Sequence, residues 1–167
     1  MDNLLQAIAL AFQDVPYPGD DNLTVYDPAG REFDETWQLL RGKAWQDFPV
    51  EAFMRGDTPI PDLSPAAFHY YMPALLTAAL KGNDDADVGQ SLMFHFSPSS
   101  AINVKGPSYT RYDDRKGFHE RLALFSPRQR EVMVWVLTEY ARRWQDDGGV
   151  AEAIEFLRAG GEPGRPT

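Results

Sequence analysis

Apolar residues recur at the spacing of an α-helix over most of the chain, and the clearest case lies between residues 63 and 80. The apolar positions of this stretch are Phe68, Tyr71, Met72, Leu75, Leu76, Ala79 and Leu80. Ser64 and Pro65 precede them as an N-cap residue and a first helical residue, and Gly82 follows as a stop signal. Pro73 interrupts the pattern, because it offers no N–H to the carbonyl of His69. We therefore expect a central helix with a proline kink.

The same spacing predicts further helices on both sides of the central one. Near the N-terminus, we expect Asp2 to cap a helix with an apolar stripe at Leu4, Leu5, Ile8 and Phe12. Shorter helices are expected from Asp34 to Gly42 and over 49–55. Ser126 and Gln129 form a capping box ahead of a long C-terminal helix. The apolar face of that helix is Val132, Met133, Val136, Leu137, Tyr140 and Trp144.

The remaining segments leave some alternatives open. A last helix is expected from about 150 to 158, burying Ile154 and Leu157. Residues 92–96 fit a helix end or a buried strand, and we favour the helix. Residues 23–33 are compatible with one small β-hairpin, and 97–117 carry no clear period. The sequence thus predicts a mainly α, single-domain helical bundle over residues 1–159, followed by a disordered tail at 160–167.

Length and composition fit this single domain. The chain has 167 residues, of which 43% are hydrophobic, enough for one sizeable core. It has no cysteine, so neither disulfides nor thiolate zinc sites are expected. We find no basic leader and no apolar run of about 18 residues, the minimum for a membrane span. These features favour a cytoplasmic protein without a membrane partner, and no cofactor or metal is expected.

Charge is the feature of this sequence that points most directly to a function. The formal net charge is -9, from 25 acidic and 16 basic side chains. The first 30 residues contain no Lys or Arg, and the acidic side chains in and just after them include Asp20, Asp21, Asp27, Glu32, Asp34 and Glu35. Such a field attracts basic partners and repels nucleic-acid phosphates. An acidic surface that only serves solubility is an equally good interpretation.

Two motifs resemble a known family. Residues 63–76 read Leu-Ser-Pro-Ala-Ala-Phe-His-Tyr-Tyr-Met-Pro-Ala-Leu-Leu, after Gly-Lys-Ala-Trp at 42–45, and residues 125–130 read Phe-Ser-Pro-Arg-Gln-Arg. This combination resembles a family of small bacterial proteins of unknown function, in which a Leu-Ser-Pro-x-x-Phe-x-Tyr-Tyr-x-Pro helix is joined to a C-terminal Ser/Thr-Pro-x-Gln-Arg helix. The likeness covers roughly residues 30–145. It implies no catalytic residues.

Candidate catalytic chemistry is sparse. The three histidines, His69, His95 and His119, are the only ordinary bases near neutral pH, and none stands at a metal-binding or catalytic spacing. A hydrolase or other enzyme remains the alternative, with His69, Tyr70 and His95 in a pocket opened by Pro73. Asn83, Asp85 and Asp87 begin like a calcium loop, but Val88 stands where the turn glycine is needed. A solvated acidic loop is the better interpretation.

Binding of a nucleic acid has one local argument, since basic and aromatic residues alternate between Lys105 and Arg130. The whole chain is anionic, however, so we favour a local salt-bridged surface. The preferred hypothesis is a non-catalytic acidic binding protein, most concretely an immunity or inhibitor protein that neutralises a bacterial toxin by binding its basic surface. The acidic residues named above would form the contact, with Tyr17, Tyr26 or Trp37 as exposed anchors.

Overall fold

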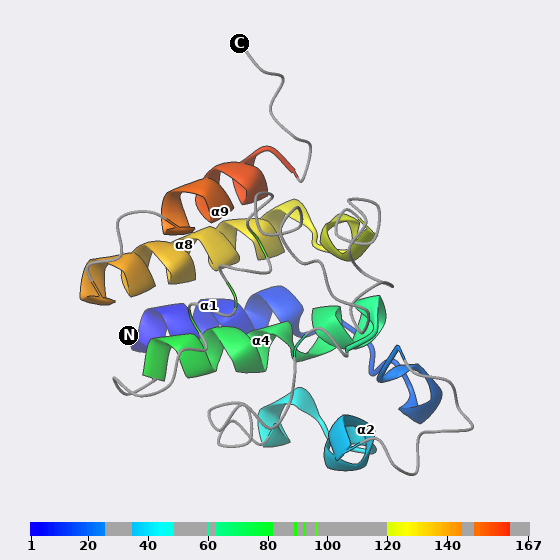
Figure 1. The fold of residues 1–167 in the computed structure, drawn as a ribbon. Helices are drawn as coiled ribbons and strands as arrows, with labels where there is room; N and C mark the ends of the chain where they lie inside the picture. Colours follow the sequence, from blue (N-terminus) through cyan, green and yellow to red (C-terminus); the bar gives the residue numbers. More distant parts are fainter. Residues whose placement is uncertain are drawn as a thin grey trace.

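The structure is a bundle of helices, arranged in layers in Figure 1. The computed structural model describes residues 1–25, 35–48, 60, 63–81, 89, 92, 96, 120–144 and 149–160. Its α-helices in these ranges are α1 (Asp2–Phe12), α2 (Glu35–Leu40), α4 (Pro65–Lys81), α8 (Pro127–Trp144) and α9 (Gly149–Arg158). Two short 3-10 helices, η1 (Asp20–Asn22) and η3 (Trp45–Asp47), flank α2. The predicted mainly α, single-domain class is confirmed.

The layers follow from which helix faces are apolar. Helices α8 and α9 lie side by side above α1 and α4, and α2 lies beyond α4 on the other side (Figure 1). Helix α1 carries Ile8 and Phe12 into the core and keeps Leu4 and Leu5 partly buried. Asp2 does not cap this helix, as we had expected. The N-cap residue is Met1, which makes no side-chain hydrogen bond there, and Asp2 is the first helical residue.

Helix α4 is the centre of the bundle, because most of its residues are buried on every side. Tyr71, Met72, Leu75 and Leu76 are fully inaccessible to solvent. The start of the helix is the predicted one, since the Ser64 hydroxyl accepts a hydrogen bond from the N–H of Ala67 at 3.0 Å. The helix continues through the buried Pro73 to Lys81. Packing against α1, α8 and η3 holds the proline inside the helix despite its cost of about 3 kcal/mol.

The capping box of α8 is also present. The N–H of Gln129 donates to the Ser126 hydroxyl at 3.2 Å, and the N–H of Ser126 donates to Oε1 of Gln129 at 2.8 Å. The apolar face of α8 buries Val132, Met133, Val136 and Leu137 as predicted. These contacts fix α8 as the helix that joins α9 to α1 and α4.

Several predicted segments lie outside the described residues: 26–34, 49–59, 82–88, 97–119 and 161–167. Within the described part, Leu92 and Phe96 have helical conformation, as we favoured for 92–96, and Gly89 is helical as well. Thr24 pairs with Leu63 in an isolated antiparallel bridge, and most of the predicted hairpin falls in the undescribed residues. No helix among the described residues is both long and apolar enough to cross a membrane.

Candidate functional site

Hydrogen bonds to the carboxylate and the carbonyl of Asp20 hold together the part of the molecule that carries Asp21 and Glu35. The Tyr17 hydroxyl donates to this carboxylate, and the backbone N–H of Gly42, just after α2, lies 2.9 Å from both the carboxylate and the Tyr17 oxygen. The indole N–H of Trp37 donates to the carbonyl of Asp20 at 2.8 Å. Gly42 has a φ of +67°, which a glycine adopts without strain. These bonds join the loop before η1 to α2.

The ionisation of Asp20 follows from these bonds. The hydrogen bond from Tyr17, then that from Gly42 and the charge of Arg41, lower the pKa of the Asp20 carboxyl. Burial and the hydrogen bond to Asp20 raise the pKa of Tyr17 to about 12. At neutral pH the pair is therefore a phenol donating to a carboxylate. Asp20 is exposed, but its charge already serves the fold.

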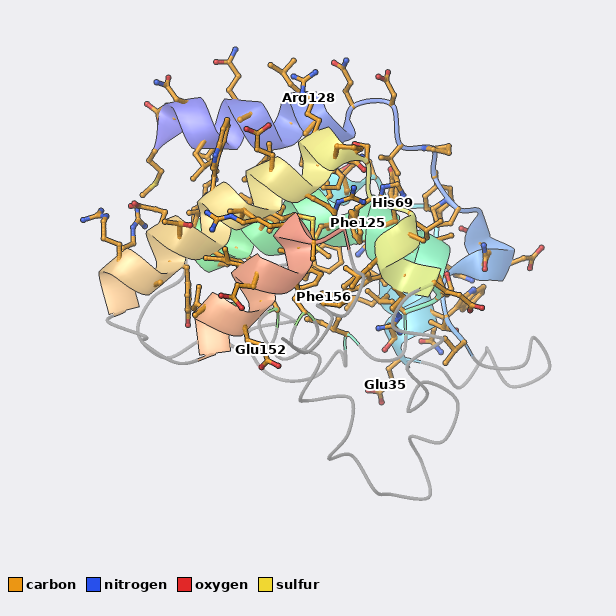
Figure 2. The ribbon with its side chains drawn as sticks, turned by 90° about the horizontal axis from the view of Figure 1, so that it is seen from above. Glu35, His69, Phe125, Arg128, Glu152 and Phe156 are labelled. Atoms are coloured by element: carbon orange, nitrogen blue, oxygen red, sulfur yellow. The ribbon has the colours of Figure 1, made fainter. Side chains whose placement is uncertain are left out.

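The other acidic candidates divide into described and undescribed residues. Asp21 on η1 and Glu35 on α2 are exposed, and Figure 2 shows Glu35 at the edge of the molecule, pointing away from the core. Asp27, Glu32 and Asp34 lie outside the described residues, so their part in such a surface stays a prediction.

The aromatic residues expected as exposed anchors are engaged within the molecule. The Tyr17 ring packs edge-on against Tyr70 with centroids 5.3 Å apart. Trp37 is partly buried, and the guanidinium of Arg41 lies 5.0 Å from its ring centroid. Tyr26, the third expected anchor, lies outside the described residues. Tyr17 and Trp37 are thus partly buried instead of exposed, and their role as binding anchors stays a prediction.

His69 occupies a packed position between α1, α4 and α8. Its ring lies edge-on to Phe125 with centroids 4.9 Å apart, and Figure 2 shows these two residues next to each other. Nε2 lies 3.1 Å from Oε1 of Gln129. Burial lowers the pKa of His69, although the hydrogen bond with Gln129 partly opposes this shift. Within the described part of the chain, no carboxylate hydrogen-bonds to or pairs with His69.

Of the other members of the enzyme hypothesis, Tyr70 is described by the structure and His95 is not. The Tyr70 hydroxyl accepts from the N–H of Trp45 at 3.4 Å, and its ring packs on Tyr17 and Tyr71. His95 and His119 lie outside the described residues, so a pocket shared by His95 with His69 and Tyr70 stays a prediction. Among the residues that the structure describes, no group of three His, Asp or Glu side chains is arranged to hold a metal.

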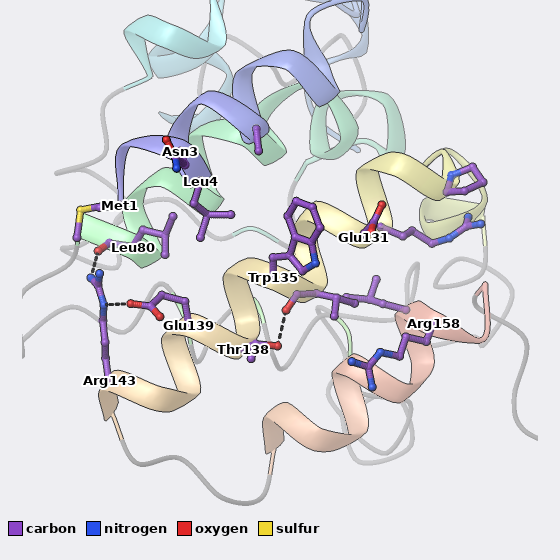
Figure 3. Close-up of a pocket in the computed structure, with 15 residues that line it drawn as sticks. Met1, Asn3, Leu4, Leu80, Glu131, Trp135, Thr138, Glu139, Arg143 and Arg158 are labelled. Atoms are coloured by element: carbon purple, nitrogen blue, oxygen red, sulfur yellow. Dashed lines mark hydrogen bonds and ion pairs between the residues drawn. The ribbon is translucent and has the colours of Figure 1, made fainter.

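A groove that the sequence did not suggest lies on the outer side of α8. It has a volume of about 990 Å³ and is bounded by the first half of α1, the end of α4, the length of α8 and the end of α9. Trp135 is 49% exposed and stands on α8 between α1 and α9 (Figure 3). Leu4, Ala7 and Val134 are among the apolar residues beside it. Large apolar side chains exposed in a concave surface are typical of interaction sites.

The charged residues of the groove are mainly arginines. Arg130, Arg143 and Arg158 line it together with Glu131 and Glu139. Arg143 donates to Glu139 and to the carbonyl of Leu80 at 2.6 Å (Figure 3). Hydrogen bonds from Arg142 and Arg143 lower the pKa of Glu139 to about 2, so this carboxylate stays ionised and neutralised. The sequence signal that could have indicated the groove is Trp135, which lies four residues after Glu131 on the polar side of α8.

Comparisons with known proteins give one match. The family model described as "Family of unknown function (DUF6714)" matches residues 1–158. No curated protein and no solved structure matches the chain.

Proposed function

We propose that this chain, which belongs to the family of unknown function DUF6714, is a non-catalytic protein that binds a basic protein partner through its acidic end. In its most concrete form, the proposal is an immunity or inhibitor protein that neutralises a bacterial toxin. This surface, called the acidic end, comprises Asp21 and Glu35, together with Asp27, Glu32 and Asp34 from the undescribed segment between these two residues in the sequence. Asp20 is not counted in this surface, because its carboxylate already accepts hydrogen bonds from Tyr17 and Gly42.

The observation that supports the proposal is the way in which the elements that carry Asp21 and Glu35 are held together. Asp20, the first residue of η1, ties η1 and the loop before it to α2 through Tyr17, Gly42 and Trp37. Asp21 and Glu35 lie on the two elements that are joined in this way, and both are exposed. A surface that is already ordered loses less conformational entropy on binding, and complementary charge accelerates association with a cationic partner. Arg41, the neighbour of Asp20, would compete weakly with such a partner.

A capture experiment with matched charge changes tests the surface. The intact chain, an Asp21→Lys/Glu35→Lys variant and an Asp2→Lys/Glu155→Lys variant are immobilised and exposed to lysate of the organism that encodes the protein. The two variants change the net charge equally, and all four positions are exposed. We expect a basic protein to be recovered equally by the intact chain and the Asp2/Glu155 variant, and about tenfold less by the Asp21/Glu35 variant. Equal recovery by all three would rule the acidic end out.

The immunity role has a separate test. Expression of the captured partner alone should arrest growth, and co-expression of the intact chain should restore it. The Asp21→Lys/Glu35→Lys variant should restore growth poorly, whereas the Asp2→Lys/Glu155→Lys variant should restore it fully. A captured partner without toxicity would contradict the immunity role while leaving the binding role in place.

A further inference from the structure

We propose that the groove between α1, α8 and α9 is a second binding surface, which takes an acidic amphipathic helix of a partner protein. This surface is separate from the acidic end and has the opposite charge preference. It is called the α8 groove below and is defined by Leu4, Arg130, Val134, Trp135, Arg143 and Arg158.

The dimensions of the α8 groove suit one face of a helix. Its lining runs along α8 from Pro127 to Arg143, which corresponds to about 24 Å at 1.5 Å per residue. Spread over that length, about 990 Å³ gives a mean cross-section of about 40 Å². A helix about 10 Å in diameter has roughly twice that cross-section, so it would lie half inside the groove. Helices α1 and α9 would form the walls and α8 the floor (Figure 3).

The apolar part of the α8 groove provides an anchor point near its middle. Trp135 is 49% exposed, whereas Val132, Met133, Val136 and Leu137 of the same helix are buried. The partly buried Leu4 and the buried Val134 also line the groove. Exposed tryptophans in concave sites are common binding hot spots, because a large rigid ring is buried at a small entropy cost. A partner helix with apolar residues at i, i+3, i+4 and i+7 matches this strip.

The charges of the α8 groove select an acidic partner. Glu139 is already neutralised by Arg142 and Arg143. The remaining charged residues of the lining are one carboxylate, Glu131, and two cations, Arg130 and Arg158. Arg130 donates to the carbonyl of Phe125, which is a neutral partner, and no carboxylate among the described residues forms an ion pair with it. Arg158 is exposed at the end of α9. In a chain with a net charge of -9, this local excess of arginine marks the groove as the place for carboxylates.

A second copy of this chain fits the α8 groove less well. A two-fold pairing would bring the same surface of both copies together. Arg130 and Arg158 would then approach the arginines of the other copy, with no spare carboxylate among the described lining residues beyond Glu131. Like charges opposed across an interface weaken it. An acidic helix from a different protein meets no such repulsion in the groove.

A peptide selection tests both the shape and the charge preference. A displayed library of helical peptides of about 16 residues, matching the groove length, carries fixed apolar positions at i, i+3, i+4 and i+7. The other positions vary freely between acidic, basic and neutral residues. Selection on the intact protein should enrich peptides with net negative charge. Enrichment of basic peptides, or no enrichment, would overturn the proposal.

Variants of the protein locate the bound peptide. Trp135→Ala should weaken binding of the enriched peptides by about tenfold or more, and Trp135→Phe by less. Arg158→Glu, a change at an exposed position, should weaken it about fivefold, which covers the case that Trp135→Ala does not fold. The controls are Leu10→Ala and Arg128→Glu, because Leu10 is 44% exposed and neither residue lines the groove. Both should bind within about twofold of the intact protein.

Two further outcomes would contradict the assignment. Unchanged peptide binding by both Trp135→Ala and Arg158→Glu, in variants with an intact circular dichroism melt, would place the peptide elsewhere. A concentration-dependent dimer of the intact chain that Trp135→Ala abolishes, measured by sedimentation, would assign the α8 groove to a second copy.

Discussion

Oε1 of Gln129 lies 3.1 Å from Nε2 of His69, at the point where α1, α4 and α8 meet. An amide oxygen only accepts hydrogen bonds, so Nε2 of His69 carries the proton. The same oxygen accepts from the N–H of Ser126, while Nε2 of Gln129 donates to the carbonyl of Ala11 at 3.1 Å. A single capping residue therefore connects three helices.

Loss of the Gln129 side chain should destabilise the fold. Gln129→Ala leaves the N–H of Ser126, the ring of His69 and the carbonyl of Ala11 without this partner, and we expect the free energy of unfolding to fall by about 1–3 kcal/mol. Urea denaturation measures it. Gln6→Ala, at an exposed site of α1, is the control and should change stability by less than about 0.5 kcal/mol. Equal effects of the two changes would contradict the bridging role.

His69 should make the protein less stable at mildly acidic pH. Burial lowers its pKa in the folded state, so the unfolded chain binds a proton more readily. Stability attributable to His69 is then full above its ordinary pKa of about 6.5 and decreases as the pH falls below that value. We expect His69→Gln to lose less unfolding free energy than the intact chain between neutral pH and about pH 5. A parallel decrease in both proteins would assign the pH dependence to other groups.

The bridge between His69 and Gln129 also shows where sequence reasoning ends. The caps at Ser64 and Ser126, the apolar faces of α1, α4 and α8, and the mainly α class were predictable, because they depend on neighbours within one helical turn or two. His69 and Gln129 are 60 positions apart, and Tyr17 and Gly42 are 25 apart. Such pairs form only when helices pack, and the sequence pattern contains no information about which polar side chains then meet.

The same limit applies to the candidate surfaces. The acidic residues near the N-terminus were visible as a composition, but not that Asp20 serves the fold while Asp21 and Glu35 remain exposed. The α8 groove was invisible, since its walls come from both ends of the chain and from α4. A tryptophan on the polar side of a helix was its one local sign.

Gly89 should tolerate no larger residue while Tyr140 stays in place. A Cβ atom at Gly89 would lie 1.9 Å from Cε2 and 2.3 Å from Cζ of Tyr140, far inside van der Waals contact. We expect Gly89→Ala to lower the unfolding free energy by about 1–3 kcal/mol through overpacking. In a double-mutant cycle, Tyr140→Ala should remove most of that added cost. Additive effects of the two substitutions would show that the ring moves aside freely.

Tyr17 should control the ionisation of Asp20. Tyr17→Phe keeps the ring but removes the hydroxyl that donates to the carboxylate, so the pKa of Asp20 should rise towards its ordinary value. Carbon-13 NMR of the carboxyl group over an acid titration measures it. Because its pKa is lowered in the folded state, the Asp20 carboxyl stabilises the fold at pH values above its ordinary pKa and loses this contribution as the pH falls. Tyr17→Phe should therefore also reduce the loss of stability in acid. Tyr70→Phe, whose hydroxyl meets Trp45 instead, should leave the Asp20 titration unchanged.

Arg142 and Arg143 provide a matched pair, because both donate to Glu139 but only Arg143 reaches another helix. The Arg142 side chain is 71% exposed, and a pair of this kind is screened by solvent and salt. Arg143 is 27% exposed and donates from Nη1 to the carbonyl of Leu80 in the last turn of α4. A cation at this end of a helix also interacts favourably with the negative end of the helix dipole.

We expect Arg143→Ala to lower the unfolding free energy by about 1–2 kcal/mol, because the carbonyl of Leu80 loses its charged donor and α4 loses a tie to α8. Arg142→Ala should have almost no effect. In about 1 M salt, where the Debye length is about 3 Å, the difference between the two variants should persist, because a partly buried bond is screened far less than an exposed ion pair. If salt abolished that difference, long-range charge attraction to Glu139 would explain it, and the bond to Leu80 would contribute nothing.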